Sequence, residues 1–185
     1  MPAAEMRLPG RHMLANALAA ALGSSLAGAE PAAIAEAIAA FRGGPHRLET
    51  VGERDGVRWV NDSQATIPEA AIAALEAFDA PIVLIAGGKD KGLEYAAFAD
   101  AIADRARAVV LIGETAARLE ELIAGRAPVS RADSMDAAVA RAAECAEPGD
   151  VALLSPAAAS FDMFADYAER GEAFRAAAER IGVRR

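Results

Sequence analysis

The sequence contains very little cysteine and histidine, and each shortage excludes a class of site. Cys145 is the only cysteine among 185 residues, so the chain forms no internal disulfide and no cysteine-cluster metal site. It falls in an apolar helical pattern, which predicts a small core residue rather than a nucleophile. The two histidines, His12 and His46, are too few for a zinc site without carboxylates at matching spacing. We therefore expect no metal site.

Long apolar runs and excess positive charge are also missing. No apolar stretch reaches the roughly 20 residues that cross a bilayer, and the first ten residues, MPAAEMRLPG, lack an apolar signal core. The net charge of −8 argues against non-specific nucleic-acid binding, which needs a basic face. We expect a cytoplasmic protein with no membrane insertion and no nucleic-acid partner. The 54% hydrophobic content predicts a packed core.

The chain changes character after its first forty residues. Leu14, Leu18 and Leu22 recur at helical spacing, and a second helix is expected to begin at Pro31. The segment RGGPHR, residues 42–47, interrupts the helical pattern and gives the best domain boundary. We therefore expect two parts, residues 1–44 and residues 45–185.

The second part alternates between strand and helix patterns. A β-hairpin is expected from residues 48–52 and 57–60, with its turn at 53–56. The expected buried strands are residues 81–86, 108–112 and 151–154, with a weaker one at 128–130. The expected helices are residues 68–78, 95–105, 116–124, 135–147 and 161–181. This alternation predicts an α/β fold with a Rossmann-like, mostly parallel sheet and helices on both faces.

Three strand ends carry residues suited to an anionic ligand, and ligands bind at such ends in open α/β sheets. They are NDSQAT at 61–66, GGKDKG at 87–92 and SPAAAS at 155–160. The second holds the only two lysines, Lys89 and Lys91. In the third, Ser160 is expected to begin a helix, where hydroxyl and N–H groups hold a carboxylate or phosphate. The pattern favours a small acidic ligand.

Each of these loops also has a purely structural interpretation. Ser63 or Thr66 can cap a helix, the lysine loop can be a solvated turn, and Ser160 can be an ordinary N-cap. The charged residues at positions 169, 170 and 172 are expected to form a solvated helix face.

Several motifs, in order, resemble the Mur ligases. LPGRH at 8–12 with NALAA at 16–20 resembles the helix that closes their central ATPase domain, and GPHR at 44–47 resembles the hinge that follows it. The later motifs are VRWVNDS at 57–63, AGGKDKG at 86–92, LSPAAASFD at 154–162 and YAERG at 167–171. The resemblance implies that residues 1–44 are the helical tail of a central domain. It implies that residues 45–185 are the C-terminal, amino-acid-presenting domain.

The resemblance is strongest to the branch that adds D-glutamate to UDP-N-acetylmuramoyl-L-alanine in peptidoglycan synthesis. In this family an acyl phosphate is made from ATP with Mg²⁺, and the amine of D-glutamate attacks it. ATP and Mg²⁺ are therefore the implied cofactors of a complete ligase. The implied site residues are Asn16, Arg47 and Asp62 for the nucleotide, Thr66, Lys91, Ser160 and Tyr167 for D-glutamate, and His46 and Gln64 near the reaction centre.

The sequence also departs from the family pattern. Gln64 stands where a lysine is common, which removes a positive charge near the reacting phosphate. Ile67 and Met13 each replace an asparagine, and Ala158 replaces a cysteine. No Walker A sequence, G-x-x-x-x-G-K-[ST], occurs, and the UDP-binding domain and magnesium-binding residues of the family have no counterpart. We expect no ligase turnover from this polypeptide alone, with the other ligase domains supplied in cis or in trans.

Other functions stay open at this point. The chain could be a non-catalytic glutamate- or nucleotide-binding module, an interaction protein that keeps the fold, or part of another amide-forming ligase such as a folylpolyglutamate synthetase. The stretch 154–162 favours the D-glutamate branch. The apolar stripes of the two N-terminal helices further predict self-association or a partner chain.

Overall fold

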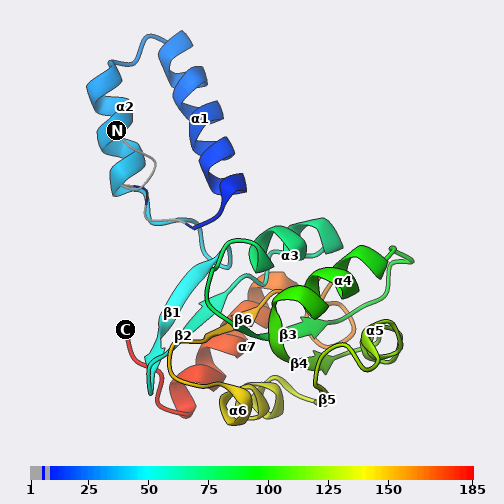
Figure 1. The fold of residues 1–185 in the computed structure, drawn as a ribbon. Helices are drawn as coiled ribbons and strands as arrows, with labels where there is room; N and C mark the ends of the chain where they lie inside the picture. The colour runs from blue at the N-terminus through cyan, green and yellow to red at the C-terminus, as the bar shows by residue number, and fades with distance from the viewer. Residues whose placement is uncertain (1–5, 7–8) are drawn as a thin grey trace. The chain divides into compact units, whose positions relative to one another are not determined.

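The computed structural model describes residue 6 and residues 9–185, so Leu8 of the LPGRH motif lies outside the described residues. The chain divides into two compact units, Met1–Gly44 and Pro45–Arg185. In the first, α1 (Arg11–Leu26) and α2 (Pro31–Ala40) pack side by side and antiparallel (Figure 1). Pro31 occupies the first turn of α2, as expected. The exposed large apolar side chains of this unit are Leu18, Leu22, Leu26 and Phe41.

The second unit is an α/β domain. Its strands are β1 (Glu49–Arg54), β2 (Val57–Asn61), β3 (Ile82–Gly87), β4 (Ala106–Ile112), β5 (Val129–Arg131) and β6 (Val151–Leu154). Its helices are α3 (Pro68–Leu75), α4 (Ala96–Arg105), α5 (Ala116–Ile123), α6 (Met135–Cys145) and α7 (Tyr167–Arg180). Within the described part of the chain these strands form one sheet in the order β1-β2-β6-β3-β4-β5.

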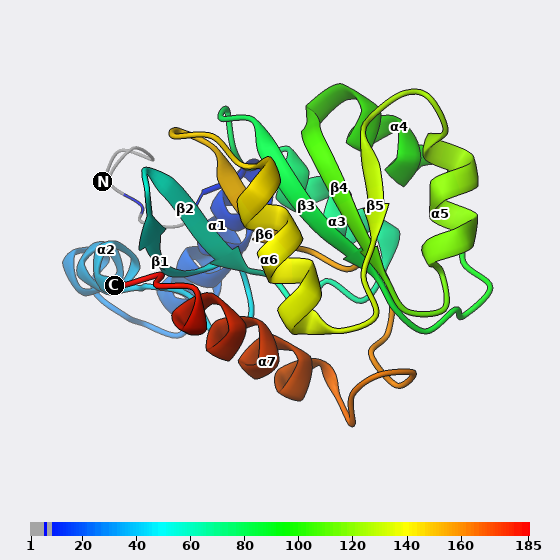
Figure 2. The same ribbon diagram turned by 90° about the horizontal axis from the view of Figure 1, so that it is seen from below.

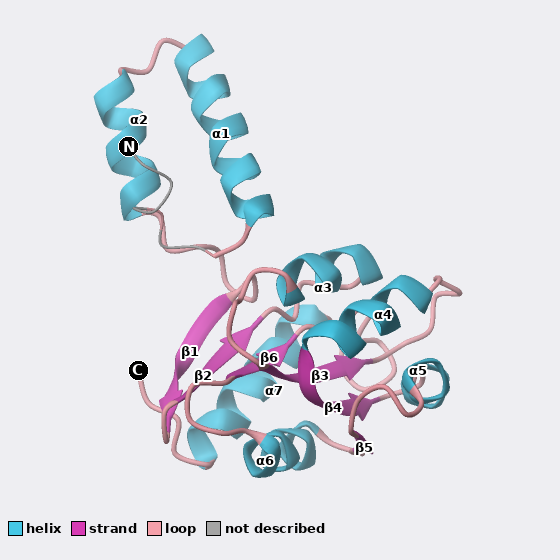
Figure 3. Cartoon of the chain, viewed as in Figure 1, coloured by secondary structure: helices cyan, strands magenta, loops and turns pink. Residues whose placement is uncertain are grey.

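The sheet is parallel except for its first strand. β1 pairs antiparallel with β2, whereas the β2–β6, β6–β3, β3–β4 and β4–β5 pairs are parallel. Asp55 and Gly56, at φ 53° and 76°, make the two-residue turn between β1 and β2. α3 and α4 cover one face and α6 and α7 the other (Figures 2 and 3). The expected Rossmann-like α/β fold, mostly parallel and covered on both faces, is confirmed.

Burial on both faces explains the apolar strand sequences. Every residue of β3 and β6 is buried, because both strands lie in the interior of the sheet. On the α6 and α7 face, Trp59 of β2 packs against Phe174 of α7, with ring centroids 6.0 Å apart. Cys145 is half-buried at the end of α6 and packs against this core. At the open edge, Glu53 of β1 exchanges two backbone hydrogen bonds with Arg184, which covers part of that strand.

Most expected elements lie within two or three residues of the observed bounds, but the last helix does not. α7 begins at Tyr167, six residues after the expected start. Asp166 is its N-cap, accepting a hydrogen bond from the N–H of Glu169 at 2.8 Å. Residues 161–166 form turns instead, and the carbonyl of Ser160 accepts from the N–H groups of Met163 and Phe164. The expectation that Ser160 begins a helix was therefore wrong.

Candidate functional site

The topology places the candidate site at the carboxyl end of β6. The chain leaves β2 and β3 toward the face covered by α3 and α4, but it leaves β6 toward α7 on the opposite face. β6 lies between β2 and β3, so the helices diverge on both sides of its end. Ligands of open α/β sheets bind at such switch points. The three loops that meet here are residues 61–66, 87–92 and 155–160, the segments that the sequence indicated.

Asp62, at the end of β2, is buried and anchored from two directions. Its Oδ1 accepts from the N–H of Leu48 at 3.1 Å, and its Oδ2 accepts from the hydroxyl of Ser155 at 2.9 Å. Burial raises the pKa of the Asp62 carboxyl to about 6, although Ser155, the Leu48 N–H and the charge of Arg47 act to lower it. Arg47 itself is exposed. The carboxylate thus joins the segment before β1 to the ends of β2 and β6.

His46 is held by neighbours from two elements. Its side chain is 6% exposed, and its Nδ1 lies 3.0 Å from Nδ2 of Asn61. Nδ2 of Asn61 also donates to the carbonyl of Gly171 at 3.2 Å. The ring of Tyr167 stands edge-on to the His46 ring, with centroids 6.2 Å apart. A Cβ at Gly171 would lie 2.2 Å from His46 Nδ1, so this position in α7 admits only glycine without rearrangement.

Arg170 contradicts the expectation of a solvated helix face. Its side chain is 1% exposed, and its guanidinium donates to the hydroxyl and carbonyl of Ser63 and to the carbonyls of Ala158 and Ala159. The hydroxyl of Ser63 in turn donates to the carbonyl of Tyr167 at 2.7 Å. Arg170 lies four residues before the buried Phe174, and this spacing puts both on the core face of α7. That spacing was a signal of burial in the sequence, which the expectation of a solvated face overlooked.

The two lysines after β3 differ in their contacts. Lys89 forms an ion pair with Glu114 at 2.8 Å, which raises the pKa of the lysine and lowers that of the glutamate. Lys91 is exposed and has no ion pair or side-chain hydrogen bond with any described residue. Of the two, Lys91 is therefore the cation available to a ligand.

The structure brings some of the expected site residues together directly. His46 contacts Tyr167, and its carbonyl accepts from the N–H of Gln64 at 3.0 Å. Thr66 is half-buried in the loop after β2, and Ser160 is 2% exposed in the loop after β6. Asn16 belongs to the other unit, where its Nδ2 lies 3.9 Å from Sδ of Met13. The functional assignments of these residues stay predictions.

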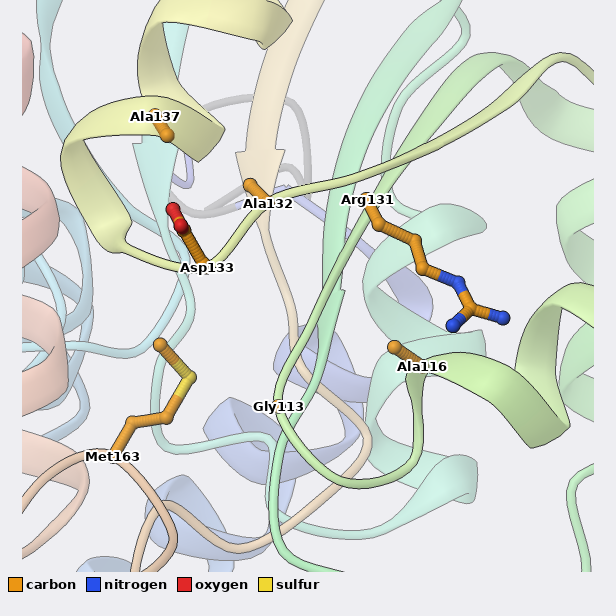
Figure 4. Close-up of a pocket in the computed structure, with 7 residues that line it drawn as sticks. All are labelled: Gly113, Ala116, Arg131, Ala132, Asp133, Ala137 and Met163. Carbon is orange, nitrogen blue, oxygen red and sulfur yellow. The ribbon is translucent and has the colours of Figure 1, made fainter.

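A separate pocket of about 620 Å³ lies beyond the ends of β4 and β5 (Figure 4). Its lining is Gly113, Ala116, Arg131, Ala132, Asp133, Ala137 and Met163. None of the expected site residues lines it, and Arg131 is already paired with Glu120. We therefore place the candidate site at β6.

Two features of the chain bear on metal and triphosphate sites. Among the described residues, no group of three or more His, Cys, Asp or Glu side chains could hold a metal ion. The sequence contains no Walker A loop. No helix in the described ranges is both long and apolar enough to cross a membrane. What the site does offer is hydroxyl and amide groups, one free lysine and a buried arginine.

Comparison with known proteins assigns the family. Residues 46–158 match the family described as "Mur ligase, glutamate ligase domain". The chain belongs to the Mur ligase family. It is 48% identical over 182 residues to UDP-N-acetylmuramoylalanine–D-glutamate ligase of Salinibacter ruber and 51% identical over 181 residues to that of Aromatoleum aromaticum. These alignments cover 98% and 96% of this chain but only 40% and 39% of the relatives.

Solved structures of two other ligases share the fold. The UDP-N-acetylmuramate-alanine ligase of Thermotoga maritima matches with a TM-score of 0.71 at 18% identity, over 95% of this chain and 39% of that one. A pseudomurein peptide ligase from Methanothermus fervidus matches with a TM-score of 0.68 at 17% identity, over 93% of this chain and 36% of that one. At these identities the similarity concerns the fold.

Sequence reasoning missed the internal contacts of the site. The sequence indicates polar or small loop residues at Asn61 and Ser155 and a loop residue or helix cap at Ser63, yet each is fully buried and hydrogen-bonded. Each has a partner more than 90 residues away in the chain, and no local pattern indicates such a pairing.

Proposed function

We propose that this chain is the amino-acid-presenting part of a ligase that joins D-glutamate to UDP-N-acetylmuramoylalanine. The observation that carries the proposal is the 48–51% identity to ligases of that name along nearly the whole chain. Folylpolyglutamate synthases share the fold, but at 17% identity for the enzyme from Mycobacterium tuberculosis. The D-glutamate ligases are therefore the better guide to the substrate.

In this proposal the complete ligase is an ATP- and Mg²⁺-dependent enzyme of peptidoglycan synthesis. It would work in the cytoplasm, where ATP and nucleotide-linked precursors are available. Residues 1–44 would be the helical tail of the central domain, and residues 45–185 the C-terminal domain. The other ligase domains, in cis or in trans, would hold the triphosphate and the metal ion. Accordingly, the purified chain should form no ADP in the presence of ATP, D-glutamate and the uridine precursor.

The part of this chain would be to hold the amino acid with its amine free to react. Lys91 would pair with one carboxylate of D-glutamate in a charge-assisted contact. Ser160 and Thr66 would donate hydrogen bonds from the loops after β6 and β2, and Tyr167 would pack beside them. The support is topological, because these loops end the neighbouring strands β3, β6 and β2. Orientation of the amine lowers the entropic part of the barrier to amide formation.

The second set of residues would face the nucleotide. Asp62 would accept from a ribose hydroxyl, and Arg47 would contact the nucleotide beside it. Asn16 belongs to the other unit, and its assignment to the nucleotide rests on the family resemblance alone. His46 and Gln64 would lie near the reaction centre. Since the His46 ring is buried among Asn61, Tyr167 and Gly171, we propose that it shapes the segment before β1 and does not transfer protons. Gln64 carries no charge, so stabilisation of the reacting phosphate would fall to the other domains.

The test is titration of the purified chain with D-glutamate, followed by NMR shifts or calorimetry. We expect saturable binding, weaker binding of L-glutamate, and about a tenfold or greater loss of affinity in Lys91→Ala. Lys89→Ala is the matched control, because it removes the same charge from the same loop but takes a lysine already paired with Glu114. Equal binding of both enantiomers, or equal loss in both variants, would contradict the proposed site.

A further inference from the structure

The buried Arg170 offers an inference beyond these assignments. Its four donated hydrogen bonds are 3.0 Å to Ser63 Oγ, 2.8 Å to Ser63 O, 3.0 Å to Ala158 O and 3.1 Å to Ala159 O. Ser63 lies in the loop after β2, and the two alanines lie in the loop after β6. Arginine suits this position because its planar guanidinium presents five donors in a fixed fork. One side chain of α7 therefore bridges two loops of the candidate site.

The third loop contacts the same guanidinium. A Cβ at Gly88 would lie 3.1 Å from Nη1 of Arg170 and 2.2 Å from the carbonyl oxygen of Ala159. The N–H of Lys89 donates to that carbonyl at 2.8 Å. The Ala159 carbonyl is thus shared by Arg170 and by the backbone of the lysine loop. Arg170 consequently lies where the loops after β2, β6 and β3 meet.

The charge of Arg170 has no direct partner in the part of the chain that the structure describes, since no carboxylate oxygen lies within 4.0 Å of it. Burial lowers its pKa to about 10, and the more distant Asp162 carboxylate acts in the opposite direction. The guanidinium therefore remains charged at neutral pH. Burying an unpaired cation is unfavourable, and an apolar side chain of similar size would fill the space without that penalty. Packing alone does not account for an arginine here.

We infer that Arg170 is a positioning residue for the amino-acid substrate. It holds the loops after β2 and β6 in one fixed arrangement, here called the frame, and it adds a positive charge behind them. The frame sets the spacing between Thr66 and Ser160, which lie three residues and one residue from its contacts. The unpaired charge favours a carboxylate at the same edge of the sheet, together with Lys91. The identity of the ligand rests on the proposed function, whereas the frame does not.

The experiment compares three variants of the full chain. Arg170→Lys keeps the charge but loses the fork, and Arg170→Met loses both. Arg180→Met is the matched control, because Arg180 lies on the same helix in an exposed ion pair with Asp136. Amide hydrogen exchange is measured at Gln64 and Lys89, in the loops after β2 and β3, and at Phe164, whose N–H donates to the Ser160 carbonyl in the loop after β6. Dissociation constants for D-glutamate are measured on the same samples.

We expect the three amides to exchange about tenfold faster, and together, in Arg170→Lys, and faster still in Arg170→Met. The dissociation constant for D-glutamate should rise by about tenfold or more in both, while Arg180→Met should match the unaltered chain. A merely structural role would accelerate exchange in α7 without coupling the three loops. If Arg170→Met does not fold, Arg170→Lys and Ser63→Ala are compared with the unaltered chain by the same exchange and binding measurements.

The outcomes separate this inference from the proposed function. If the three loops loosen together but the unaltered chain binds no D-glutamate, the frame stands and the assigned substrate fails in this chain. If the unaltered chain binds D-glutamate and both Arg170 variants bind it equally well, the positioning role is overturned while the proposed function stands. Unchanged exchange at the three amides would likewise overturn the frame.

Discussion

The loops after β2 and β6 differ from the loop after β3 in how their side chains are held. In the first two, the polar side chains of Asn61, Asp62, Ser63 and Ser155 are buried and hydrogen-bonded within the protein. In the third, Gly88 is buried but Lys89 and Lys91 are exposed. The first two loops form a wall whose geometry exists before any ligand binds. The third carries charge that is still hydrated.

This difference shows where stability and recognition are located. Groups in the wall have already lost their water and their rotamer freedom on folding, so a ligand meets them in place. A solvated lysine contributes little to folding and keeps its hydration until an anion replaces it. Substitutions in the wall should therefore change stability strongly, and those at the lysines should change binding with little effect on folding.

The largest effect is expected at the glycine where the two kinds of loop join. Gly88 has φ 148°, and a Cβ there would lie 2.2 Å from the Ala159 carbonyl oxygen. Gly88→Ala should lower the free energy of unfolding by about 3 kcal/mol or more, through overpacking and backbone strain together. Gly92→Ala, with φ 69° and no atom within 4 Å, should lose only about 1 kcal/mol from strain. Chemical denaturation measures both, and equal losses would show that contact with the wall does not distinguish Gly88 from the exposed end of its loop.

The next effect concerns pH and the buried carboxyl of the wall. The pKa of Asp62 is raised from 3.8 to about 6, so the folded protein binds a proton more tightly than the unfolded chain. Its contribution to stability is therefore present below about pH 4 and is lost as the pH rises to about 6. The loss amounts to about 3 kcal/mol above that pH. Asparagine has no charge to titrate, so Asp62→Asn should lack this pH dependence of the free energy of unfolding.

The measurement is the difference in unfolding free energy between Asp62→Asn and the unaltered chain from pH 4 to pH 8. The asparagine Oδ1 still accepts from the Leu48 N–H, and its Nδ2 donates to the Ser155 hydroxyl. The difference should grow in favour of Asp62→Asn between pH 4 and pH 6 and then stay level. Glu49 and Glu114, whose pKa values are lowered, occur in both proteins and cancel. Parallel curves would show that Asp62 is not buried as described.

A smaller effect is expected at Asn61. The N–H of Ser63 donates to Asn61 Oδ1 at 3.1 Å, so Nδ2 is the group that donates to Nδ1 of His46. The His46 ring must then carry its hydrogen on Nε2, which nitrogen-15 NMR reads directly. Asn61→Ala should lower the free energy of unfolding by about 2 kcal/mol and leave the tautomer unfixed. A hydrogen on Nδ1 in the unaltered protein would refute this arrangement.

The sequence predicted the sheet well because its signals are local. Apolar runs marked β3, β4 and β6, and the turn at residues 53–56 marked the hairpin of β1 and β2. The start of α7 was missed because residues 161–166 continue a helix-like pattern, and only the capping geometry of Asp166 reveals the break. Arg170 was missed because charge suggested solvent, although its spacing to Phe174 indicated the core.

The burial of Asp62 was beyond any local pattern. It depends on the N–H of Leu48, fourteen residues earlier, which is directed at the carboxylate from a backbone with φ 44°. His46 has φ 60°, so two non-glycine residues of the HRL segment, one on each side of Arg47, adopt left-handed conformations. Such geometry needs tertiary contacts to persist, and the contacts themselves join segments that only the folded sheet brings together.

The smallest effects on stability are expected at the two lysines. They test whether the side chains of the loop after β3 contribute as little to folding as their exposure indicates. Lys91→Ala should change the free energy of unfolding by less than about 0.5 kcal/mol, because no described residue pairs with Lys91. Lys89→Ala should show a small loss at low salt that disappears at high salt, since its pair with Glu114 is exposed and screened. Thermal unfolding at two ionic strengths measures both. If Lys91→Ala destabilises the chain as much as Asn61→Ala does, the loop after β3 belongs to the wall, and loss of ligand binding there could no longer be separated from loss of structure.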